Sequence, residues 1–224
     1  MGRVFALKNV RLFYKKSGTL RFVSHLDMNR FMTRIVRLSK VPVWYTEGFN
    51  KHPYITFALP LSLGFDSEYE VMDFRLDNDE FPLERAKEMI KAVCPSGMEI
   101  IDLREPVYKA GKIAFADFEC RFATDSGTIE DTLKTFLAQK EIIVSKKTKK
   151  GGINQIDIAP KISFFDVREE NQQIILSLRL PAGGQDNINP KILVNAYFES
   201  IGSKNPYCHI TRRMLYLQDG KIFM

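Results

Sequence analysis

Residues 24–40 are SHLDMNRFMTRIVRLSK, and this stretch decides the fold class. Apolar side chains recur there at the i, i+3, i+4, i+7 and i+8 spacing of one helix face. They are Met28, Phe31, Met32, Ile35 and Val36. Val41 and Pro42 then end the pattern, because proline does not continue a helix. The stretch predicts a surface helix that buries one face.

Strand patterns lie on both sides of this helix. Residues 10–14 (VRLFY) precede it, short strands at residues 43–45 and 55–58 follow it, and residues 68–76 alternate apolar with polar side chains. A second helix is expected at residues 82–93 and a closing strand at residues 98–103. This β-α-β-β-α-β order is typical of a ferredoxin-like domain.

The second half of the chain repeats the order. Its strands are expected at residues 116–122, 141–145, 174–180 and 209–217, and its helices from residues 128 and 190. Pro106 and Gly111 interrupt the pattern between the halves. We therefore predict an α+β protein of two tandem ferredoxin-like (βαββαβ) domains with antiparallel sheets, residues 1–106 and 112–224.

The composition is that of a globular protein, with 45% hydrophobic and 27% charged residues among 224. No apolar run reaches the roughly 18 residues of a membrane span, and no signal peptide is expected. Cys94, Cys120 and Cys208 lie far apart, which favours free thiols in a reducing cytoplasm over disulfides or zinc. A net charge of +6 favours a polyanionic partner, although ordinary solubility explains it too.

The start of the first helix is one candidate site. Ser24 and Asp27 have the spacing of a capping box, which by itself explains both residues structurally. The same cap places Arg21 and His25 at a helix N-terminus, where unpaired backbone N–H groups and the helix dipole attract phosphate.

The exposed side of this helix is a second candidate. Arg30, Arg34 and Arg37 lie on one face, opposite the apolar residues. The face is either a solvated surface, with Asp27 and Arg30 as an i, i+3 pair, or a stripe that follows a phosphate backbone.

The polar loop at residues 45–53, YTEGFNKHP, is a third candidate. It is rich in side chains that stack on bases or hydrogen-bond to them. These are Tyr45, Glu47, Phe49, Asn50, Lys51 and His52. Turn formation explains Gly48, Asn50 and Pro53 equally well.

No complete catalytic motif is present. The sequence has no P-loop, G-x-G-x-x-G, G-x-S-x-G or H-E-x-x-H, so we expect no cofactor and favour a binding protein over an enzyme. His25, Asp27, Glu47 and His52 match no metal-ligand spacing, so no metal is predicted, and whether they bind one stays open. A basic stretch at residues 146–152 is either solvated or a further polyanion contact.

Three stretches resemble one known family. LRFVSHLD at residues 20–27, YTEGFNKHP at residues 45–53 and ITFALPLSLG at residues 55–64 look like the radical-SAM-linked bacterial domain family of unknown function. Lys51 departs from the proline expected at that position of the family pattern. The resemblance implies a radical-SAM partner and a link to the modification of RNA or of a ribosomal component, but it implies no reaction.

Three functions are compatible with these residues. We favour an RNA-binding module that presents an RNA or ribosomal substrate to a partner enzyme. The second is a protein-interaction adaptor for a radical-SAM enzyme. The third is a metal-independent endoribonuclease, in which either His25 or His52 would be the catalytic base and the other the acid.

Overall fold

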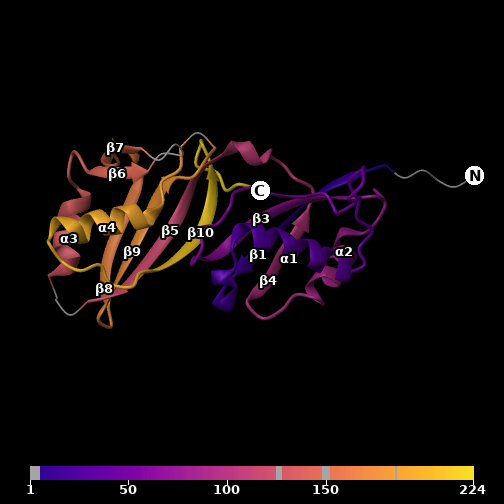
Figure 1. The fold of residues 1–224 in the computed structure, drawn as a ribbon, viewed down its shortest axis with the longest axis horizontal. Helices are drawn as coiled ribbons and strands as arrows, with labels where there is room; N and C mark the ends of the chain where they lie inside the picture. The colour runs from indigo at the N-terminus through magenta and orange to yellow at the C-terminus, as the bar shows by residue number, and fades with distance from the viewer. Residues whose placement is uncertain (1–5, 125–127, 148–151, 185) are drawn as a thin grey trace, which may run out of the picture. The chain divides into compact units, whose positions relative to one another are not determined.

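The computed structural model describes residues 6–124, 128–147, 152–184 and 186–224, which form two compact units (Figure 1). One unit is Met1–Ile113 with Ile222–Met224, and the other is Ala114–Lys221. The predicted class is confirmed: the chain is mixed α+β, its sheets are mostly antiparallel, and four α-helices occur among the described residues. None of the described helices is long and apolar enough to cross a membrane.

The first unit contains one antiparallel sheet and two helices. In chain order these are β1 (Lys8–Lys16), a 3-10 turn η1 (Gly18–Phe22), α1 (His25–Leu38), β2 (Ile55–Phe57), β3 (Asp66–Leu76), α2 (Leu83–Lys91) and β4 (Met98–Arg104). The sheet order is β4-β1-β3, with β2 paired to the far side of β3. Leu12 of β1 therefore lies opposite Met72 on one side and Leu103 on the other.

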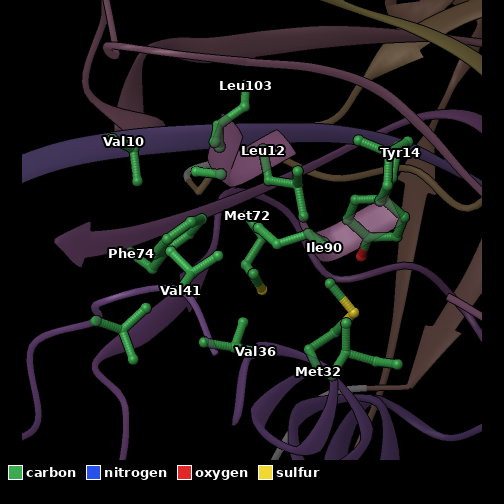
Figure 2. Close-up of a cluster of buried hydrophobic side chains, with 14 of the residues drawn as sticks. Val10, Leu12, Tyr14, Met32, Val36, Val41, Met72, Phe74, Ile90 and Leu103 are labelled. Carbon is green, nitrogen blue, oxygen red and sulfur yellow. The ribbon is translucent and has the colours of Figure 1, made fainter. Parts of the chain in front are cut away.

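The core of this unit lies between the sheet and its helices. Met32 and Val36 of α1 point toward Met72 and Phe74 of β3, and Ile90 of α2 closes the same cluster (Figure 2). All five of these side chains are at most 1% exposed. The predicted helix therefore buries its apolar face as expected, and its opposite face is left to solvent.

The second unit has the same general order with an added hairpin. It contains β5 (Ile113–Ala123), α3 (Ile129–Leu137), β6 (Ile143–Lys147), β7 (Ile153–Asp157), β8 (Phe164–Glu170), β9 (Gln173–Pro181), α4 (Pro190–Ser200) and β10 (His209–Leu217). Its main sheet has the order β10-β5-β9-β8, and β6 pairs only with β7 in a separate two-stranded sheet.

The structure corrects two of the predicted strands. Residues 43–45 form single-residue bridges instead of a strand, because the neighbouring Pro42 and Pro53 have no N–H for a ladder. The strand predicted at residues 141–145 lies in the separate hairpin, and β8 takes the edge position beside β9. The sequence of β8, FFDVREE, does not alternate apolar with polar residues, so the pattern that predicts a strand is missing there.

Candidate functional site

The three stretches that carry the family resemblance meet at α1. The backbone N–H of Gly64 donates to the carbonyl oxygen of Arg21 at 2.8 Å. The ring of His25 packs edge-on against Phe57, with 5.2 Å between the ring centroids. At the last turn of α1, Arg37 donates to the carbonyl oxygen of Lys51 at 3.5 Å. We call the resulting surface the α1 face: residues 21–25, the arginines of α1 and residues 45–53.

Ser24 and Asp27 form the predicted helix cap. The Ser24 hydroxyl accepts from the Asp27 backbone N–H at 3.2 Å and donates to the Asp27 carboxylate at 2.7 Å. The same carboxylate pairs with Arg30 at 3.2 Å. The cap contributes about 1 kcal/mol to the helix. Both residues therefore have a structural role, while His25, the first residue of α1, stays exposed.

Arg21 is held against the protein and is only 21% exposed. Its Nε donates to the Gly18 carbonyl oxygen at 3.0 Å, and its Nη2 lies 3.3 Å from the Asp66 carboxylate. Asp66 was missed by sequence reasoning, since nothing local shows that the start of β3 reaches Arg21. Phe22, which is 67% exposed, was also missed. It lies within residues 20–27, one of the stretches that resemble the family, and this position could have identified it as a candidate site residue.

The three arginines of α1 are exposed as predicted, but their partners differ. Arg30 is paired with Asp27, as noted above. Arg37 lies over the Tyr45 ring at 5.9 Å from its centroid, in addition to its contact with Lys51. Arg34 has neither a hydrogen bond nor an ion pair with any residue that the structure describes. Its charge is therefore available to a ligand.

The loop at residues 45–53 is closed by hydrogen bonds at its base. The Thr46 backbone N–H donates to the His52 carbonyl oxygen at 2.9 Å, and the His52 N–H donates to the Thr46 hydroxyl at 3.3 Å. The His52 Nδ1 lies 2.9 Å from the Asn50 carbonyl oxygen. Since a carbonyl oxygen only accepts, this contact is a hydrogen bond when Nδ1 carries a proton.

The tip of this loop is solvent-facing. Phe49 is completely exposed, at 109% of its reference area, and Tyr45 at the base is 39% exposed. Glu47, Asn50 and Lys51 are exposed too. Gly48, which directly precedes the exposed Phe49, has a φ of +121°, a value in the region that favours glycine.

The two histidines lie at different ends of α1. His25 is its first residue, whereas the loop that carries His52 is attached to its last turn through Arg37. These positions are about 18 Å apart along a helix axis. Within the described ranges, no group of three or more His, Cys, Asp or Glu side chains is placed to hold a metal ion. The basic stretch at residues 146–152 lies largely outside the described residues.

A family model described as "Uncharacterized protein conserved in bacteria (DUF2344)" matches residues 9–190. The match spans all three quoted stretches, and the description mentions neither RNA nor radical-SAM enzymes. No curated protein matches the chain.

Two solved structures are distantly similar. The first, "Crystal Structure of a Cbf5-Nop10-Gar1 Complex", is 11% identical with a TM-score of 0.45, and the match covers 92% of this chain and 48% of that one. This chain thus spans about half of the length of that relative. The second, an unknown protein from Galdieria sulphuraria, is 10% identical with a TM-score of 0.28, covering 92% of this chain and 98% of that one. Both TM-scores are below 0.5, so neither likeness bears on function.

Proposed function

The chain belongs to the DUF2344 family of uncharacterized proteins conserved in bacteria, and we propose that its α1 face binds RNA. The observation that carries this proposal is the position of Arg37. Its guanidinium contacts both the Tyr45 ring and the backbone of Lys51, so the arginines of α1 and the aromatic loop form one continuous surface.

A surface that combines cations with exposed aromatic rings suits a nucleic acid, because cations bind its phosphates and rings stack on its bases. Arg34, Arg37 and Lys51 are exposed and would contact phosphates, which release counterions when they are neutralised. Tyr45 and Phe49 offer flat apolar faces, on which bases stack whatever their sequence. Acidic side chains are present as well: Asp27 and Asp66 are paired with Arg30 and Arg21, whereas Glu47 is an exposed carboxylate of the loop.

In this proposal the protein is a module that presents a cytoplasmic RNA or ribosomal substrate to a partner enzyme of the radical-SAM class. The partner comes from the family resemblance of the three quoted stretches. We further propose that each unit is a ferredoxin-like domain. The sheet orders β4-β1-β3-β2 and β10-β5-β9-β8 support this, because each places the first strand of its unit beside the last and the third.

An adaptor that docks on a protein is a second candidate, and a separate observation favours it. Phe22, Leu26 and Leu63 are each more than 60% exposed, and the Gly64–Arg21 hydrogen bond brings the two chain segments that carry them together. Leucine side chains bury well against a protein but offer no stacking face to a base. No comparable observation favours the endoribonuclease, since the two histidines lie at different ends of α1.

The test is fluorescence anisotropy of the full chain with a labelled single-stranded RNA in the presence of chelator. Arg34→Ala/Arg37→Ala should weaken binding about tenfold or more, because two phosphate contacts are lost. Arg168→Ala/Lys191→Ala removes the same charge from exposed positions of the second unit and is the matched control. The proposal fails if the chain does not bind RNA or if both double variants bind equally weakly.

A further inference from the structure

We infer that the α1 face takes unpaired nucleotides, with one base stacking on the ring of Phe49. This inference rests on the proposed function and specifies the class of RNA that it would bind. It follows from three features of the loop at residues 45–53: the exposure of its tip, the hydrogen bonds at its base and the chemistry of the neighbouring side chains.

The ring of Phe49 makes no packing contact that would give it a structural role among the described residues. It is fully exposed, and no ring or cation packs on it among the described residues. Single exposed apolar residues are common on protein surfaces and need no explanation by themselves. Phe49 differs because of the way that its loop is held.

The loop is held in one shape before any ligand binds. Thr46 and His52 are joined by two hydrogen bonds, one between their backbones and one from the His52 N–H to the Thr46 hydroxyl, and Tyr45 and Pro53 form a bridge directly behind them. The rotation of the His52 ring is restricted as well, because its Nδ1 lies 2.9 Å from the Asn50 carbonyl oxygen. A ring presented by a closed loop loses little conformational entropy when a base stacks on it.

The side chains beside Phe49 suit a nucleotide. The Asn50 amide is exposed, has no partner in the described part of the chain and can pair with a base edge through both its donor and its acceptor. Lys51 is exposed next to it, and Arg37 holds the Lys51 carbonyl oxygen from the helix side. One base and its phosphate would therefore meet a stacking face, a hydrogen-bonding edge and a cation in three consecutive residues.

Whether a base can stack on the Phe49 ring depends on whether that base is paired in the RNA. In a duplex both faces of each base are covered by the neighbouring pairs, and the deep groove of an A-form helix is too narrow for side chains. A protruding phenyl ring could stack only after a base was pulled out of that stack, which costs free energy. An unpaired base offers its face at little cost, so the exposed ring favours single strands, loops and bulges.

The experiment compares one labelled RNA sequence in two forms, single-stranded and closed in a hairpin stem, with the full chain and four variants. Phe49→Leu keeps an apolar side chain without a stacking face, and Phe49→Trp keeps the stacking face. Phe49→Ala removes both. Phe164→Ala, at a residue of the second unit that is 52% exposed, is the control for loss of an exposed phenyl ring.

We expect the wild type, Phe49→Trp and Phe164→Ala to prefer the single strand. Phe49→Ala should bind the single strand about 5- to 150-fold more weakly, the range for one lost base stack, with little change for the hairpin. Phe49→Leu should behave like Phe49→Ala. Equal binding of both RNA forms, unchanged by Phe49→Ala, would overturn this inference and leave the proposed function standing. Absence of binding to either RNA would overturn both and direct attention to a protein partner.

Discussion

The backbone N–H of Gly64 donates to the carbonyl oxygen of Arg21, with 2.8 Å between the nitrogen and the oxygen. The bond fastens the segment before β3 to η1, the turn that leads into α1. The other end of this turn is fastened in a similar way, because the Ser17 N–H donates to the Gly97 carbonyl oxygen at 2.8 Å. Gly64 and Gly97, which are distant from η1 in the sequence, therefore hold the two ends of this turn in place before α1 begins.

Gly97 should be intolerant of any side chain. Its φ is +88°, and an added Cβ would lie 2.5 Å from the Ser17 carbonyl oxygen, which is backbone and cannot easily move. Gly97→Ala should lower the free energy of unfolding by about 2 kcal/mol or more. Gly111→Ala is the matched control, because a Cβ there meets open space. Chemical unfolding of both variants checks the prediction, and equal stability of the two would refute it.

The Arg11–Asp73 pair should be a major stabilising contact of the first unit. The Arg11 side chain is fully buried, donates twice to the Asp73 carboxylate at 2.7 Å and lies 4.5 Å from the centre of the Phe223 ring. Asp73→Ala leaves this guanidinium without its counter-charge and should cost about 3 kcal/mol. Glu88→Ala breaks the exposed pair with Lys91 and should cost less than about 0.5 kcal/mol. Urea unfolding midpoints that shift equally would contradict this account.

Local patterns were enough to predict most of the helices and strands, but not the contacts between distant residues. The apolar spacing of residues 24–40 predicted both α1 and the exposure of Arg34. A helical period that places the apolar side chains on the buried face places Arg34 on the opposite, exposed face. Arg11, by contrast, stands inside an apolar strand pattern, and its partner Asp73 depends on the register between β1 and β3. Asp66 and Gly64 were missed as parts of the site for the same reason, since each reaches Arg21 only in the folded chain.

Glu119 should make the stability of the second unit depend on pH. Burial alone would raise the pKa of this carboxyl, but hydrogen bonds from Arg121 and Arg213, at 2.5 and 2.7 Å, outweigh it and hold the pKa below its usual value. A carboxylate with a lowered pKa stabilises the folded state above the unfolded pKa of about 4.3, and the contribution is lost as the pH falls through the folded value.

Glu119→Gln should therefore be less stable than the wild type by about 1–2 kcal/mol at neutral pH. The difference should stay constant down to about pH 5 and shrink below about pH 4.3. Denaturant unfolding of both proteins from pH 7 to pH 3 measures it. A difference that does not change over this range would show that the charge of Glu119 does not contribute.

Cys94 should be a slow nucleophile at neutral pH. Burial raises the pKa of its thiol to about 11, and the thiol donates to the Ile90 carbonyl oxygen at 3.3 Å. Since only the thiolate attacks, alkylation by iodoacetamide should be slow at pH 7.5 and accelerate up to about pH 11. Peptide mapping by mass spectrometry follows this residue separately from the other cysteines. A rate that levels off near pH 8.5, the pKa of a free cysteine, would be inconsistent with this pKa.

The salt dependence of RNA binding tests the central claim most directly. The logarithm of the binding constant of the full chain for a single-stranded RNA is plotted against the logarithm of the salt concentration, and the slope counts phosphate contacts. We predict that Arg34→Ala/Arg37→Ala makes this slope shallower by about 1.4, about 0.7 for each lost contact. Equal slopes for the wild type and this double variant would contradict the assignment of the α1 face as the surface that binds RNA.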